Sequence, residues 1–154
     1  MAFTLNSPAF ARNARIPKQF TRDGDNLSPP MHWEGAPSRA RSYALVVEDA
    51  DAPRGTFHYW AAYDIPADAH NLPQGAGSGE LGAAIRMGIN DFGNSHYDGP
   101  QSPAGRGQHH YHFRLFALDV RELDVPDDCS AEQVLEAAVA HSLAQTEAVG
   151  VFGR

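Results

Sequence analysis

Cysteine is almost absent from this sequence, which contains a single residue of this type, Cys129. A chain with one cysteine forms no internal disulfide and no cysteine-based zinc site. The stretch from Met1 to Phe10 lacks a basic segment followed by a long apolar run, and no other stretch approaches the ~18 apolar residues of a membrane span. We therefore expect no membrane span and a reducing compartment, the cytoplasm. We interpret Cys129 as a small surface or half-buried residue before a helix, because no thiol-activating neighbour is evident.

Positive charge is also scarce. Lys and Arg together number 12, against 19 Asp and Glu, which gives a formal net charge of −7 at pH 7. Such a surface repels phosphate polymers and anionic membranes unless its basic residues cluster. The charge balance therefore argues against nucleic acid as a partner.

The phosphate-binding and nucleophile motifs of several enzyme classes are missing. No loop ends in Gly-Lys-Ser or Gly-Lys-Thr and no serine lies in a Gly-x-Ser-x-Gly elbow, which argues against kinase, NTPase and esterase functions. The segment Gly77-Ser-Gly79-Glu-Leu-Gly82 matches a dinucleotide fingerprint in form. It follows a proline-containing loop instead of a strand, so it lacks the context that this motif requires. We expect no cofactor.

The sequence does contain many short segments that are typical of strands, separated by turns. Its 154 residues match one domain, 1–154, and 14 Gly and 11 Pro indicate frequent turns. Short apolar or alternating runs predict strands over 42–48, 56–65 and 111–120. Repeated turn signals leave residues 1–40 as short extended pieces in which no helix is expected.

One helix is predicted near the C-terminus. Ser130 and Gln133 have the spacing of a capping box, and apolar residues recur at helical spacing from Val134 to Leu143. Together with the strands, this pattern predicts a mainly β protein, a two-sheet β-sandwich with one or two peripheral helices.

Two carboxylates, Asp49 and Asp51, follow the first predicted strand. If strand geometry continues through both, their side chains point to one face about 7 Å apart. The alternative is an Asx-type turn before Pro53, in which a side chain bonds the backbone.

Histidines cluster at His109, His110 and His112. On a strand, His110 and His112 share one face, whereas His109 shares the other with Tyr111. Imidazoles and carboxylates together suit zinc or non-haem iron. One sequence does not show three ligands converging, and histidines held by hydrogen bonds are more common, so we expect no metal.

Six short motifs occur in order along the chain: Asp25-Asn-Leu-Ser-Pro-Pro-Met-His-Trp33, Val47-Glu-Asp-Ala-Asp-Ala-Pro53, Tyr63-Asp-Ile-Pro66, Asn90-Asp-Phe-Gly93, Tyr97-Asp-Gly-Pro100 and His109-His-Tyr-His-Phe113. In this order they resemble the phosphatidylethanolamine-binding protein family, and most closely its bacterial Raf-kinase-inhibitor-like branch. The resemblance runs from about Phe3 to Phe152.

The resemblance implies a β-sandwich with a small surface pocket for an anion such as phosphate, acetate or a phospholipid head group. The ligand-binding residues that it implies are Asp49, Asp51, Pro53, Gly99, Pro100, His109 and Tyr111. The aspartates would orient His109 and help keep it protonated, while His109, the Tyr111 hydroxyl and backbone N–H groups of the Gly99 loop face the anion.

The chain departs from the family pattern at the second strand. The pocket histidine of the family falls at Tyr59, and His58 precedes it where the order Tyr-His is usual. A one-residue offset turns a side chain to the opposite face unless the strand contains a bulge. We therefore expect Tyr59 to supply a hydroxyl to the pocket and His58 to lie outside it. Further candidate contacts are Phe57, His58 and His110, the last at a position where arginine is usual.

Two classes of function remain open, with a third beside them. The first is a cytoplasmic small-ligand-binding protein, homodimeric by analogy with the family. The second is an enzyme that uses Asp51, His109, Tyr111 and Tyr59 as a general acid/base set on a small polar metabolite. The third is an interaction module that inhibits a kinase or protease of unknown identity through the pocket rim.

Overall fold

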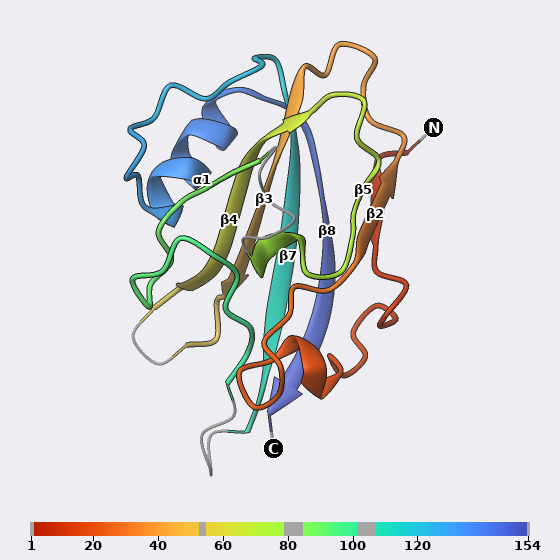
Figure 1. Cartoon of the computed structure of the whole chain (residues 1–154). Coiled ribbons are helices and arrows are strands. Elements are labelled where there is room, and N and C mark those ends of the chain that lie inside the picture. The colour runs from red at the N-terminus through yellow and green to blue at the C-terminus, as the bar shows by residue number, and fades with distance from the viewer. Residues whose placement is uncertain (1, 53–54, 79–84, 102–106, 154) are drawn as a thin grey trace.

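Two antiparallel sheets packed face to face form the body of the protein, and one α-helix covers the outside of the larger sheet (Figure 1). This computed structural model describes residues 2–52, 55–78, 85–101 and 107–153. The larger sheet has the strand order β6-β4-β3-β7-β8, and its strands are β3 (Ser42–Asp49), β4 (Phe57–Pro66), β6 (Arg86–Met87), β7 (Gln108–Leu118) and β8 (Ser142–Gly153). The smaller sheet has the order β1-β2-β5, with β1 (Thr4–Asn6), β2 (Met31–Glu34) and β5 (Asn71–Leu72). The β-sandwich prediction is confirmed.

Alternation along the strands divides the buried side chains into two cores. Between the sheets, Trp33 of β2 packs against Tyr43 of β3, with ring centroids 5.3 Å apart, and Trp60 and Phe113 belong to the same buried cluster. On the opposite face of the large sheet, Phe116 and its neighbours pack beneath the helix. A strand covered on both faces reads as a continuous apolar run, which is why β3 is buried along its whole length.

The helix α1 (Ala131–Ala140) begins as the capping box predicts. The Ser130 side chain accepts a hydrogen bond from the backbone N–H of Gln133, and the Gln133 side chain accepts one from the backbone N–H of Ser130. Cys129, just before the helix, is fully buried, and its thiol donates to the Tyr63 hydroxyl over 3.6 Å. The expectation of a surface or half-buried cysteine was therefore wrong.

Two local predictions also need correction. The helix ends at Ala140, and Leu143 lies in β8, a strand of 12 residues that the sequence pattern did not predict. The local helical spacing there is overridden because β8 pairs with β7 from Gly153 back to Ser142. A single 3₁₀ turn, η1 (Lys18–Phe20), interrupts the N-terminal region where no helix was expected, and it places the Phe20 side chain in the core. A second 3₁₀ turn, η2 (Ala76–Ser78), lies in the glycine-rich loop, of which residues 79–84 fall outside the described ranges.

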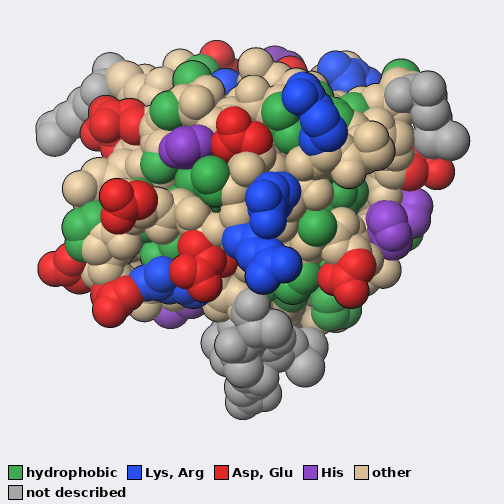
Figure 2. Space-filling view, turned by 90° about the horizontal axis from the view of Figure 1, so that it is seen from above, with side chains coloured by type: hydrophobic (Ala, Val, Ile, Leu, Met, Phe, Trp, Pro, Cys, Tyr) green, Lys and Arg blue, Asp and Glu red, His purple; other side chains and the backbone are tan. Residues whose placement is uncertain are grey.

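The two ends of the sandwich differ in character. At the upper end in Figure 1, the loops line a shallow hollow with charged residues of both signs, among them Arg41, Asp64, Arg121 and Glu122. Figure 2, which views the molecule from above, shows acidic and basic side chains interspersed. The histidine-rich start of β7 lies at the opposite, lower end.

Candidate functional site

The lower end of the large sheet brings together segments that are far apart in the sequence. Asp49, the last residue of β3, stands opposite Phe57 of β4 on one side and Tyr111 of β7 on the other. His109 stands opposite Phe152 of β8. These strand ends surround a cavity of about 190 Å³, which is lined by Asp49, Ala52, Phe57, Tyr59, Phe92, Gln101, Gly107, His109, Tyr111 and Phe152.

A histidine-carboxylate pair is the most polar feature of this cavity. The Nδ1 atom of His109 lies 2.7 Å from Oδ2 of Asp49, whose side chain is almost wholly buried. Because Nδ1 faces the carboxylate, it carries the proton of a neutral ring, and Nε2 is the nitrogen left for a ligand. The ring becomes an N–H donor toward the cavity when Nε2 also takes a proton.

Asp51 does not share a face with Asp49. The strand β3 ends at Asp49, and the backbone N–H of Asp51 donates to Oδ1 of Asp49 over 2.8 Å, as in the Asx-type turn that was the alternative. The Asp51 carboxylate turns instead to His110 on the exposed rim, 3.2 Å from its Nδ1. A hydrogen bond from the backbone N–H of His110 lowers the pKa of Asp51. Of the two alternatives, the Asx-type turn is therefore the one that the structure contains, and neither Asp51 nor His110 is among the cavity-lining residues.

A β-bulge determines which way Tyr59 points. Val47 pairs with Trp60 and the next residue, Glu48, pairs with His58, so Tyr59 has no partner on β3. The extra residue keeps Tyr59 on the cavity side together with Phe57 and sends His58 to the outer face. There His58 is buried, with Nδ1 3.1 Å from the Asp91 carboxylate and Nε2 3.6 Å from that of Glu48.

Two tyrosines meet at the back of the cavity. The rings of Tyr59 and Tyr111 pack edge to face, with centroids 5.3 Å apart and an interplanar angle of 81°. Burial raises the pKa of Tyr59 to about 12, and burial together with Tyr59 and Asp49 raises the pKa of Tyr111 further. Both hydroxyls therefore stay protonated near neutral pH and act as uncharged hydrogen-bond donors.

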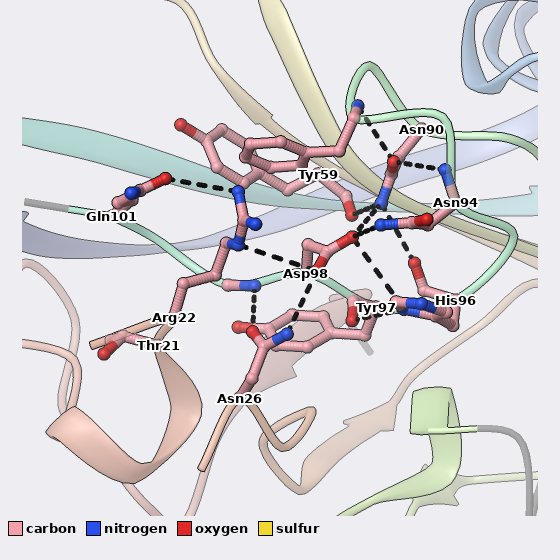
Figure 3. Close-up of polar contacts among 12 residues, drawn as sticks. Thr21, Arg22, Asn26, Tyr59, Asn90, Asn94, His96, Tyr97, Asp98 and Gln101 are labelled. Atoms are coloured by element: carbon pink, nitrogen blue, oxygen red, sulfur yellow. Dashed lines mark hydrogen bonds and ion pairs between the residues drawn. The ribbon is translucent and has the colours of Figure 1, made fainter. Parts of the chain in front are cut away.

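A buried carboxylate that sequence reasoning missed supports one cavity wall (Figure 3). Asp98 is 2% exposed, and its oxygens accept hydrogen bonds from the side-chain amides of Asn26, Asn90 and Asn94, at 3.0, 2.8 and 2.9 Å. Burial alone would raise the pKa of Asp98, but these three amides and nearby His96 lower it below its ordinary value. The only signal in the sequence was that Asp98, Asn90 and Asn26 each lie in one of the six motifs.

Arg22 joins this network to the cavity. Its guanidinium donates to the side chain of Gln101 over 3.2 Å (Figure 3). It also lies 4.0 Å from the centroid of the Phe92 ring, and both Gln101 and Phe92 line the cavity. Its Nε atom lies 3.8 Å from Asp98. The network therefore positions the Phe92 side chain, because the Arg22 guanidinium that it holds lies over the face of the Phe92 ring.

Gly99 and Pro100 lie behind this wall. The backbone N–H of Gly99 donates to Asn26 over 2.7 Å, and the carbonyl of Pro100 accepts from the backbone N–H of Arg22 over 2.8 Å. The Gly99 N–H is therefore already bonded within the protein. Residues 102–106 of the same loop, whose N–H groups were also expected to face the anion, lie outside the described ranges. Pro53 lies outside the described residues. Within the described ranges, no three His, Cys, Asp or Glu side chains are grouped in a way that could hold a metal ion.

Comparison with known proteins establishes the family. The family model described as phosphatidylethanolamine-binding protein matches residues 6–153. This chain belongs to that family. A phosphatidylethanolamine-binding protein homologue from Chlamydia trachomatis has the same fold, with a TM-score of 0.87, 32% sequence identity and coverage of 99% of this chain and 98% of the other. YbcL of Escherichia coli, described as a member of the mammalian family, gives a TM-score of 0.93 at 28% identity and covers 100% and 99% of the two chains.

Similar sequences of the family occur in distant organisms. A UPF0098 protein of Methanothermobacter thermautotrophicus is 40% identical over 151 residues, which cover 97% of this chain and 98% of the relative. A Mycobacterium tuberculosis relative with a lipoprotein name, LppC, is 37% identical over 97% of this chain and 71% of its own length. In the part of this family member that the structure describes, no helix is long and apolar enough to cross a membrane.

Proposed function

We propose that this member of the phosphatidylethanolamine-binding protein family binds a small anionic ligand in the cavity at the lower end of the large sheet. The observation that carries the proposal is the His109–Asp49 pair, 2.7 Å apart, at the edge of a cavity of about 190 Å³. The buried carboxylate holds Nδ1, so that a proton gained at Nε2 is presented to the ligand. Asp49 acts on the imidazole and not on the anion.

The overall charge of the chain does not oppose this role. The formal net charge is −7, but charges beyond a Debye length of about 8–10 Å are screened by salt. In the cavity the ligand meets the His109 ring, which offers an N–H from Nε2 once it takes up a proton, and tyrosine side chains with neutral hydroxyls. N–H and O–H groups are the donors that an anion requires. One small anion can therefore bind to a chain that repels anionic polymers.

Acetate and inorganic phosphate, titrated separately and followed by NMR of the histidine rings, test this proposal. Either anion is expected to shift the His109 resonances, and His109→Ala is expected to abolish saturable binding. His112→Ala is the matched control, because His112 lies on the same strand but pairs with Glu147, 3.2 Å away, outside the cavity. An unshifted His109 signal with both anions would overturn the proposal.

A cytoplasmic location and a homodimer complete the proposal. The homodimer rests on analogy with the family, and the single, buried Cys129 suits a reducing compartment. Light scattering of the purified chain tests the dimer. Fractionation of the cells that produce the protein tests the location. The test is needed because the Mycobacterium tuberculosis relative is named as a lipoprotein.

A further inference from the structure

The cavity wall is more aromatic than a small inorganic anion requires. Five of its residues are aromatic: Phe57, Tyr59, Phe92, Tyr111 and Phe152. Phe92 meets Phe57 edge to face with centroids 4.8 Å apart, and it meets Tyr59 at 5.6 Å. Such walls favour a flat apolar group, because its binding buries apolar surface, and each Å² that is removed from water contributes about 25 cal/mol of favourable free energy.

The size of the cavity fits a single ring. It measures about 190 Å³. An apolar cavity of about 150 Å³ holds a benzene molecule. The remaining volume leaves room for a carboxylate attached to the ring but not for a second ring.

The charges around the cavity favour an anion that carries one charge. His109 lies beside Asp49, and the Arg22 guanidinium, behind Phe92, is near Asp98. Arg15 lies over the ring of Phe152, 4.7 Å from its centroid, and does not itself line the cavity. A monoanion that enters with one proton on His109 leaves the charge of the site unchanged. A phosphate dianion adds a second negative charge, and among the described side chains that line the cavity only His109 can carry a positive charge to balance it. Unbalanced charge in an apolar site is costly.

The hydrogen-bond donors suit a carboxylate group. Protonated His109 offers Nε2–H, and Tyr59 and Tyr111, which line the same cavity and hydrogen-bond to each other, keep uncharged hydroxyls. A carboxylate presents two acceptor oxygens in one plane with its ring, so it can use both kinds of donor while the ring lies among the aromatic walls.

We propose that the cavity selects a monocarboxylate with a flat aromatic body, its carboxylate at His109 and the tyrosine hydroxyls and its ring against Phe57, Tyr59 and Phe92. This selectivity rests on the anion-binding function proposed above. The ligand class is an aryl carboxylate of about the size of benzoate.

Calorimetric titration of the full chain with benzoate, acetate and inorganic phosphate near neutral pH tests the selectivity. Benzoate is expected to bind about tenfold more tightly than acetate, because its ring buries apolar surface, and phosphate more weakly than benzoate. Phe92→Leu, which keeps apolar volume but removes the flat ring, is expected to weaken benzoate about fivefold and to weaken acetate less than benzoate. Val139→Ala, at an exposed position on α1, is the control and should change neither affinity.

The outcomes separate the two proposals. If acetate and phosphate shift His109 but benzoate binds no more tightly than acetate, the aryl carboxylate proposal is overturned and the anion site stands. If phosphate binds more tightly than benzoate, the charge argument is overturned as well. If no anion shifts His109, both proposals fail. Thermal unfolding tests whether the Phe92→Leu variant is folded. If it is not, Tyr59→Leu is used instead, because it also removes an aromatic ring from the cavity wall.

Discussion

Tyr59 of β4 and Tyr111 of β7 pack edge to face, with ring centroids 5.3 Å apart, although the resemblance to the family implies the order Tyr-His where this chain has His58-Tyr59. The bulge in β4 makes this contact, because Tyr59 has no pairing partner on β3 and is free to face the cavity. Where an imidazole is usual, this chain therefore presents a neutral hydroxyl and an aromatic face. His109 is the one imidazole among the residues that line the cavity.

Replacing Asp49 by Asn should weaken acetate binding by about tenfold, because the amide no longer stabilises the imidazolium or fixes its Nδ1 proton. Calorimetric titration measures the change. Asp51→Asn is the matched control, since Asp51 pairs with His110 on the rim and should leave the affinity within about twofold. Equal losses in the two variants would contradict the assignment of Asp49 as the positioning residue.

Stability in acid should depend on Asp98. Its pKa is lowered in the folded state, so its ionised form contributes stability that is fully present above the unfolded pKa of about 3.9 and is lost as the pH falls through the folded pKa. Asp98→Asn should lower the free energy of unfolding by about 1–3 kcal/mol near neutral pH, because an amide group faces the amides of Asn90 and Asn94. Urea unfolding of the wild type and of Asp98→Asn across the acid range measures the difference in their free energies of unfolding. The difference between them should shrink in acid, and a constant difference would contradict the role of the charge.

Stability in alkali should depend on Tyr59. Burial raises its folded pKa to about 12, above the unfolded value of about 10, so its contribution is fully present below the unfolded pKa and is lost as the pH rises through the folded pKa. Wild-type protein should lose stability over this interval more steeply than Tyr59→Phe, which has no proton to lose. Urea unfolding at a series of alkaline pH values measures the slopes, and identical slopes would show that the tyrosine titrates normally.

Gly99→Ala should destabilise the protein by about 2 kcal/mol or more, since an added Cβ would collide with the backbone carbonyl oxygen of Phe20. Gly93→Ala is the control for backbone strain alone, because Gly93 has φ +89° and nothing lies within 4 Å of an added Cβ. That control should cost about 1 kcal/mol. Thermal unfolding of the two variants ranks them, and the reverse order would contradict the close approach at Gly99.

Local patterns were sufficient where one segment determines its own structure. The Ser130–Gln133 capping box, the buried strand that begins at Ser42 and the alternation of β7 were predictable, because each depends on hydrogen bonds or periodicity within a few residues. The strand β8 was not, because its pairing with β7 spans distant parts of the chain and overrides a helical spacing. Asp98 was missed for the same reason, since its partners Asn26 and Asn90 come from separate loops.

The sequence by itself determined the family, the β-sandwich and the candidates Asp49, His109, Tyr111 and Tyr59. Only the tertiary structure decided which of the candidate side chains point into the cavity. The end of β3 sends Asp49 and Asp51 to different histidines, and the bulge keeps Tyr59 inside while His58 lies outside. The pairing register between strands decides which face of the sheet a side chain points to, and one added residue in a strand reverses that face. The walls of a cavity therefore cannot be specified from the sequence without the register.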